Sequence, residues 1–139
     1  MLVKSANCIA QVENEEIVVS LRIDGIMHVY LKPGVNITVE SQARMLDAYG
    51  KLTEIPRPFV FEPGEFSSIT KEARANAIKI ESNSPVLASA IVVNNLGQRI
   101  LADYYYKFNK PKTPIKIFKN MDLAIEWLTE HHLQDIHKV

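Results

Sequence analysis

Residues 57–74, RPFVFEPGEFSSITKEAR, contain the pattern that decides the fold. The apolar run at residues 59–61 is typical of a short strand that is buried on both faces. Pro63-Gly64 ends this strand, and a cluster of hydroxyl residues then leads into an alanine-containing helix that Thr70 is expected to cap. A strand–turn–helix unit of this kind places hydroxyls and free backbone N–H groups at the carboxyl edge of a sheet. Open α/β folds usually bind their ligands at that edge.

A β-hairpin is predicted upstream of this unit. Apolar and polar residues alternate over residues 17–23 and again over residues 26–31, on either side of Asp24-Gly25. Two such runs are typical of a hairpin with a type I′ turn, because the Asp-Gly pair accepts positive φ angles. Thr38 then caps a helix that extends to about Leu52. The buried stripe expected on that helix consists of Val39, Ala43, Leu46 and Tyr49 or Gly50.

The remaining elements continue the alternation of strands and helices. Residues 86–93 predict a central strand, after which Asn94-Asn95 turns the chain into a third helix with Leu96 on its inner side. Residues 115–118 predict the last strand, and Asn120 caps a final helix. The order β-β-α-β-α-β-α-β-α predicts an α/β fold. Its expected form is a mixed, mostly parallel five-stranded sheet with an N-terminal antiparallel hairpin and four helices.

Length and composition point to one ordinary globular domain. We expect residues 15–133 to form it, residues 1–14 to be an arm or an extra edge strand, and residues 134–139 to be a tail. Equal numbers of basic and acidic residues, 16 of each, argue against a nucleic-acid partner. The single cysteine, Cys8, fits a reducing compartment. Because no apolar run approaches the ~20 residues of a membrane span, we expect a soluble cytoplasmic protein without a membrane partner.

Several segments also carry a resemblance to a known family. In these segments the chain resembles the STAS domains of SpoIIAA-like (anti-sigma-factor-antagonist) fold, and most closely small bacterial STAS/SEC14-like proteins. The segments are residues 24–29 (DGIMHV), 32–34 (KPG), 48–52 (AYGKL), 68–74 (SITKEAR) and 109–112 (NKPK). The resemblance implies a SpoIIAA-like fold and a regulatory, non-enzymatic role in protein–protein interaction. In phosphorylatable members a serine in the strand–helix turn is modified by a partner kinase, and the added charge breaks the partner complex.

Three sets of residues are candidate sites. The candidate phosphoacceptors or anion ligands are Ser67, Ser68 and Thr70. The candidate partner surface consists of Glu65, Lys71, Arg74 and Lys79. The candidate ligand loop contains Asn94, Asn95 and Arg99. Helix capping is the simpler explanation for the hydroxyls, which lie at a helix start. For the two asparagines, a turn and a helix cap are as good an explanation as a ligand site.

Other chemistry-bearing residues have plainer explanations. His28 is expected on the outer sheet face with Ser20, Arg22, Tyr30 and Lys116, and no carboxylate partner for it is apparent in the sequence. The aromatic residues at 104–108 continue a buried helix stripe, and the histidines at 131–137 lie near a fraying end. No catalytic signature such as Gly-x-Ser-x-Gly or His-Glu-x-x-His occurs, so we predict no enzyme, cofactor or metal.

The leading interpretation is a regulatory signalling module whose partner is a kinase, a phosphatase or a sensor component. One alternative is a SEC14-like carrier that binds a small ligand or lipid at the strand ends near Ser68 and Asn95. Another is a homodimer with a structural role only, in which the sequence does not fix the contact face.

Overall fold

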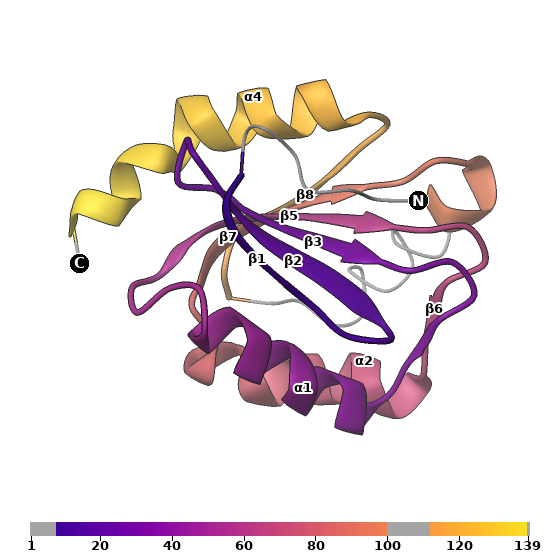
Figure 1. Cartoon of the computed structure of the whole chain (residues 1–139). Helices are drawn as coiled ribbons and strands as arrows, with labels where there is room; N and C mark the ends of the chain where they lie inside the picture. The colour runs from indigo at the N-terminus through magenta and orange to yellow at the C-terminus, as the bar shows by residue number, and fades with distance from the viewer. Residues whose placement is uncertain (1–7, 100–111, 139) are drawn as a thin grey trace.

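The computed structural model describes residues 8–99 and 112–138 (Figure 1). Its strands are β1 (Cys8–Glu13), β2 (Ile17–Arg22), β3 (Met27–Leu31), β4 (Asn36–Ile37), β5 (Arg57–Pro63), β6 (Ser68–Ile69), β7 (Val86–Val92) and β8 (Ile115–Phe118). Its helices are α1 (Val39–Gly50), α2 (Lys71–Ile80) and α4 (Met121–His131), with short 3-10 turns η1 (Glu81–Asn83) and η2 (Leu133–Lys138). Residues 96–99 are also helical.

Six of these strands form one mixed sheet in the order β1-β2-β3-β5-β7-β8. β1, β2 and β3 pair antiparallel, and β3, β5, β7 and β8 pair parallel. In Figure 1, α1 and α2 lie below this sheet and α4 lies above it. The mixed, mostly parallel sheet with an N-terminal hairpin is therefore confirmed. The sheet has six strands because residues 8–13 pair with β2 as an extra edge strand.

A second, two-stranded sheet joins β4 to β6. Each of its strands has two residues, which is too short for any periodic pattern in the sequence. The pair connects the segment before α1 with the segment before α2, and so it aligns two successive strand–helix connections.

The hairpin between β2 and β3 differs from prediction in its turn. The N–H of Gly25 donates to the carbonyl of Arg22 at 3.0 Å, and the N–H of Arg22 donates to the carbonyl of Ile26 at 2.9 Å. Gly25 has a φ of 91°, whereas Asp24 does not have a positive φ. The predicted type I′ turn is therefore wrong. The connection is a three-residue loop in which the glycine alone takes the left-handed conformation.

Two apolar cores lie on opposite faces of the sheet. The core below it includes Val19, Val29 and Phe59 with Tyr49 of α1, and burial raises the pKa of Tyr49. The core above it comprises mainly small and branched residues of β5 and β7 against Ala124 and Leu128 of α4. Ala124 and Leu128 are the buried residues of α4.

Helix α1 buries only part of the predicted stripe: Tyr49 is buried and Leu46 is partly buried against the core, as predicted. Ser41 and Gln42 are buried, whereas Val39 and Ala43 are exposed. The Ser41 hydroxyl donates to the Glu16 carboxylate at 2.6 Å, and this bond compensates for its burial. The Nε2 group of Gln42 donates to the backbone carbonyl of Ala73 at 2.8 Å. A polar bridge to α2 therefore takes the place expected for apolar packing.

The connection into β8 is held by Glu81. Its carboxylate accepts hydrogen bonds from the N–H groups of Lys112 and Thr113 at 3.1 and 2.6 Å, and from the Thr113 hydroxyl at 2.8 Å. Desolvation raises the pKa of Glu81, but the hydrogen bonds from Thr113 and Lys112 outweigh it and hold that pKa below its usual value.

The third helix can be compared with prediction only at its beginning. Leu96, predicted to lie on the inner side, is 73% exposed, so that assignment is wrong. The predicted aromatic stripe at residues 104–108 lies outside the described residues. None of the helices in the described ranges has the length and apolar character that a membrane crossing requires.

Candidate functional site

The segment between β5 and α2, residues 64–70, lies at the carboxyl edge of the sheet, as predicted, and we call it the edge loop. Its first residue is clamped to the neighbouring strand: the N–H of Gly64 donates to the carbonyl of Leu31 at 2.7 Å. A Cβ atom at Gly64 would lie 2.5 Å from that carbonyl oxygen and 2.9 Å from the nitrogen of Pro33. Only glycine fits this position, so the edge loop begins at a fixed point.

The rest of the edge loop is held by the preceding strand–helix connection. The N–H of Gly34 donates to the carbonyl of Glu65 at 2.8 Å, and the N–H of Ser68 donates to the carbonyl of Val35 at 2.8 Å. The N–H of Thr70 donates to the carbonyl of Ile37 at 2.9 Å. Backbone hydrogen bonds thus hold the edge loop at several points between its first and last residues. These bonds fix the backbone from which its side chains project.

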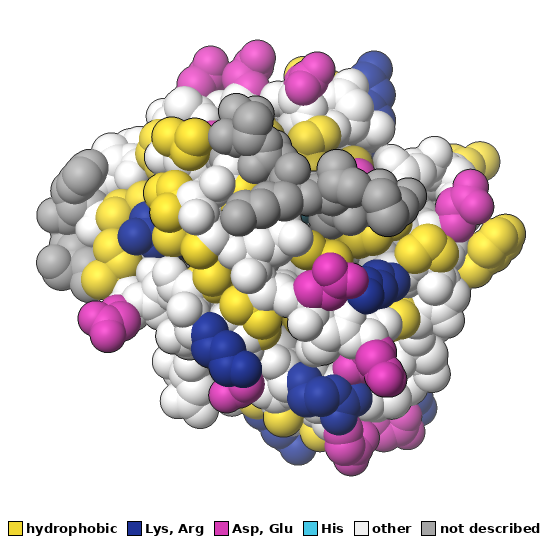
Figure 2. Space-filling model, viewed as in Figure 1, with side chains coloured by type: hydrophobic (Ala, Val, Ile, Leu, Met, Phe, Trp, Pro, Cys, Tyr) yellow, Lys and Arg dark blue, Asp and Glu magenta, His cyan; other side chains and the backbone are white. Residues whose placement is uncertain are grey.

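Phe66 is the most distinctive residue of the edge loop. Its φ is 60°, and among the described residues it is the one non-glycine residue with a positive φ. Its side chain is 88% exposed. In Figure 2, hydrophobic side chains project from the right-hand edge of the molecule, where the loops after β3 and β5 lie in Figure 1. The fold therefore holds a large aromatic side chain in solvent on a strained backbone.

The three candidate hydroxyls have separate roles. Thr70 is the N-cap of α2, and its hydroxyl oxygen accepts the N–H of Ala73 at 3.0 Å. The Ser67 hydroxyl donates to the carbonyl of Gly64 at 2.8 Å and so closes the turn. The Ser68 side chain is exposed, and its hydroxyl donates to Oδ1 of Asn36 at 2.8 Å. Capping therefore accounts for Thr70, whereas Ser68 takes no part in the cap.

The candidate partner surface is only partly contiguous. Glu65 and Lys71 are exposed on and directly after the edge loop, and Nη1 of Arg74 donates to the carbonyl of Ile69 at 2.9 Å. Lys79 is in the last turn of α2. Because a helix rises 1.5 Å per residue, Lys79 is about 12 Å along the axis from Lys71. The structure brings three of these residues to the edge loop and leaves Lys79 at the other end of α2.

The candidate ligand loop forms a helix start next to the edge loop. Oδ1 of Asn95 accepts the N–H of Gln98 at 2.8 Å, and Oε1 of Gln98 accepts the N–H of Asn94 at 2.7 Å. Nδ2 of Asn94 donates to the carbonyl of Pro63 at 3.3 Å, which ties this loop to the end of β5. Reciprocal capping accounts for these side chains. The N–H of Arg99 donates to the carbonyl of Asn95 at 3.1 Å.

His28 has a partner that sequence reasoning missed. Its Nε2 lies 2.9 Å from Oε1 of Glu62, although the two residues are far apart in the chain. Parallel pairing of β3 with β5 sets His28 opposite Val60. Glu62 is two residues further along β5, so its side chain lies on the same face of the sheet as that of Val60. The expectation that no carboxylate is near His28 is therefore wrong. Two-residue periodicity places Glu62 on this face, but only the strand register sets it beside His28.

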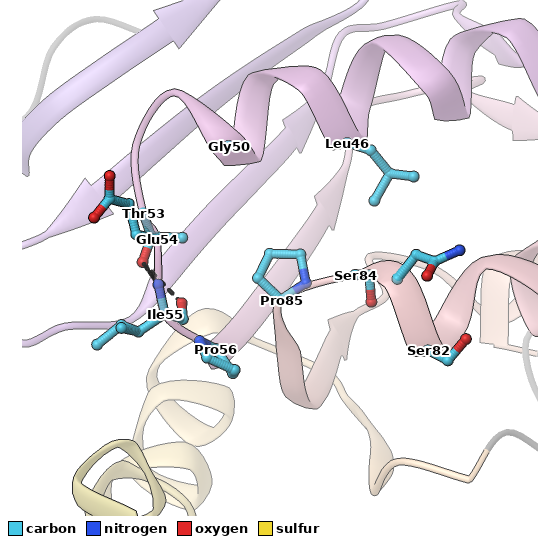
Figure 3. Close-up of a pocket in the computed structure, with 10 residues that line it drawn as sticks. Leu46, Gly50, Thr53, Glu54, Ile55, Pro56, Ser82, Ser84 and Pro85 are labelled. Atoms are coloured by element: carbon cyan, nitrogen blue, oxygen red, sulfur yellow. Dashed lines mark hydrogen bonds between the residues drawn. The ribbon is translucent and has the colours of Figure 1, made fainter. Parts of the chain in front are cut away.

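A shallow cleft of about 300 Å³ lies at the opposite, amino edge of the parallel strands (Figure 3). Its lining comes from the end of α1 and from the two loops that lead into β5 and β7. The residues are Leu46, Gly50, Thr53, Glu54, Ile55, Pro56, Ser82, Asn83, Ser84 and Pro85. This cleft is thus remote from Ser68 and Asn95, where the carrier alternative places a ligand.

Comparisons with known proteins agree with this architecture. The family model for a domain of unknown function, DUF7793, matches residues 19–132. A search of curated proteins finds no match. A solved structure, an uncharacterised protein of the DUF3478 family with a SpoIIAA-like fold from Shewanella loihica PV-4, is similar with a TM-score of 0.55. The two chains are 17% identical, and the similarity covers 86% of this chain and 99% of that one. The fold is therefore SpoIIAA-like, and the chain belongs to the DUF7793 family.

Proposed function

We propose that this chain is a non-enzymatic regulatory module that binds a protein partner through the edge loop. The exposure of Phe66 carries this proposal. Its side chain is 88% exposed and offers a large apolar contact to a partner. Because hydrogen bonds already hold the backbone of the edge loop, binding would cost little further conformational entropy. Aromatic residues of this kind are frequent binding hot spots in protein interfaces. The left-handed backbone at Phe66 adds support, because strained conformations cluster at functional sites.

The surroundings of Phe66 suit a protein interface. Glu65 and Lys71 supply exposed charges of opposite sign on either side of the aromatic ring in the sequence. Leu96, 73% exposed, is the first residue of the helix whose start Asn94 ties to the end of β5. Apolar residues flanked by polar ones are the usual composition of a transient interface.

Phosphorylation of Ser68 would control this binding. The Ser68 side chain is exposed, and its hydroxyl has one hydrogen-bonded acceptor, Asn36. A phosphate there would add roughly two negative charges two residues from Phe66. An apolar contact centred on Phe66 would then have to desolvate these charges, so the complex with the partner would dissociate. The partner expected from this logic is a kinase, a phosphatase or a sensor component of a signalling pathway.

The test is a quantitative pulldown from the native host with three baits. These are the wild-type chain, Phe66→Ala, and Ile23→Ala as the matched control, because Ile23 is a 65% exposed apolar residue on the distant hairpin. We expect the wild type and Ile23→Ala to recover the same signalling component and Phe66→Ala to lose it. Recovery that is equal with all three baits, or of no such component with any, would refute this function.

Ser68 is tested separately. The chain is incubated with host lysate and ATP, and the edge loop is then examined by mass spectrometry in the wild type and in Ser68→Ala. We expect one phosphate on the wild-type loop and none on the variant. An unmodified wild-type loop, under conditions that modify a control STAS protein, would exclude phosphorylation control and leave the binding role to the pulldown.

A further inference from the structure

Among the residues that the structure describes, no strand pairs with the outer edge of β1. Strand β1 is the terminal strand of the sheet order and lies nearest the viewer in Figure 1. The N–H of Asn14 donates to the carbonyl of Ile17 at 3.0 Å, which makes this a hydrogen-bonded pair. Hydrogen-bonded and non-hydrogen-bonded residue pairs alternate along two antiparallel strands. The pair of Val12 and Val19, two positions before Asn14 and Ile17, is therefore also hydrogen-bonded, and the backbone groups of Val12 point toward β2. The backbone N–H and carbonyl groups of Gln11 and Glu13 therefore point away from β2.

The edge lacks the usual protection. Its sequence, CIAQVE, contains neither proline nor lysine, the residues that commonly block pairing at an edge strand. The one charged side chain, Glu13, is already neutralised by Nζ of Lys32 at 2.6 Å. A register irregularity between Cys8 and Ala10 bends the first part of the strand, which confines regular pairing to residues 10–14.

We propose that β1 pairs antiparallel with β1 of a second copy of this chain, about a two-fold axis through Val12. In this register Gln11 faces the second copy's Glu13, and Glu13 faces the second copy's Gln11. Both pairs use the outward backbone groups, and no like charges are opposed. The two-fold axis makes the contact self-complementary, as closed dimers require.

The side chain at the axis favours this register over its neighbours. Val12 is partly buried and packs against the core below the sheet. Pairing of Val12 with the second copy's Val12 would cover its remaining surface and make the apolar layer continuous across two six-stranded sheets. A register centred on Gln11 would instead place the bulged Ile9 opposite Glu13, which pairs an apolar residue with a charged one.

Two variants of Gln11 test the use of the backbone edge. In Gln11→Pro the outward N–H is removed, while the bonds between β1 and β2 do not use it and proline is tolerated on an edge. Gln11→Ala is the matched control, because both variants lose the 3.2 Å bond between Gln11 and the Ser20 hydroxyl. By sedimentation velocity up to millimolar concentration, we expect the wild type and Gln11→Ala to reach twice the 15.7 kDa monomer mass. Gln11→Pro should stay at 15.7 kDa, with an unchanged circular dichroism spectrum.

Cysteine crosslinking tests the register, even if Gln11→Pro does not fold. In a Cys8→Ser background, Val12→Cys places the two thiols on Cα atoms about 4.5 Å apart, which a disulfide can bridge. Ala10→Cys points to the same face, but the register separates its two copies by about 14 Å. We expect oxidation to give a covalent dimer for Val12→Cys and not for Ala10→Cys. A wild-type monomer at all concentrations, a dimer that persists in Gln11→Pro, or equal crosslinking at both positions would overturn the proposal.

Discussion

Replacing Phe66 with glycine is expected to stabilise the fold and weaken partner binding in the same molecule. A non-glycine residue in the left-handed region, here at φ 60°, costs about 1–2 kcal/mol. Glycine relieves this strain but adds roughly 0.5–1 kcal/mol of unfolded-state entropy. The side chain is 88% exposed, so its removal gives up little buried area. The net expectation is a free energy of unfolding that rises by about 0.5–1 kcal/mol.

Chemical denaturation of the wild type, Phe66→Gly and Phe66→Ala separates the two effects. Phe66→Ala also lacks the ring but keeps the strained backbone, so its free energy of unfolding should stay within about 0.5 kcal/mol of the wild type. In thermal unfolding, Phe66→Gly should melt roughly 2–4 °C higher than the wild type. Both variants should bind the partner at least about 30-fold more weakly if Phe66 is a hot spot.

Two results would contradict a strained, partner-binding Phe66. A Phe66→Gly variant that is less stable than Phe66→Ala would mean that the left-handed conformation carries no strain. Partner binding that is unchanged in both variants would mean that the Phe66 ring does not contribute to the interface.

Three further predictions concern stability. Gly64→Ala should lower the free energy of unfolding by about 1–3 kcal/mol in a urea titration, because the new Cβ meets the Leu31 carbonyl at 2.5 Å. Gln42→Ala should cost about 1–3 kcal/mol, since it removes the bridge to the Ala73 carbonyl and empties a buried position; a loss under 0.5 kcal/mol would show that the bridge is unimportant. Glu81 has a lowered pKa in the folded chain, so its contribution is complete above its unfolded value of about 4.5 and is lost as the pH falls through the folded value. The stability difference between wild type and Glu81→Gln should therefore shrink below pH 4.5, and a difference that is constant with pH would contradict this assignment.

Local sequence signals predicted most elements of the fold. Thr38, Thr70 and Asn120 are the N-caps of α1, α2 and α4, because a capping side chain acts within a few residues of itself. Alternation over β2 and β3 and apolar continuity in β7 likewise depend on local burial. The errors on α1 arise where contacts with distant segments determine which residues are buried. Burial of Ser41 depends on Glu16, and burial of Gln42 depends on the backbone of α2.

In the candidate site, too, the features set by local sequence could be predicted and those set by distant segments could not. The hydroxyls of the edge loop could be located from the strand–helix turn, since their position depends on sequence order. The left-handed φ of Phe66 could not, because phenylalanine has no preference for that conformation and the clamp at Gly64 comes from β3. The pair of His28 and Glu62 needs the register of two parallel strands, which pattern alone does not fix.

Photo-crosslinking in the native host tests whether Phe66 contacts a protein partner. A benzoyl-phenylalanine residue is incorporated at position 66 in one strain and at position 23 in another, because both positions are highly exposed. We predict one discrete crosslinked signalling protein from position 66, absent from position 23 and lost when Ser68 is phosphorylated. If position 66 yields no crosslinked protein, or the same products as position 23, Phe66 is not a partner contact.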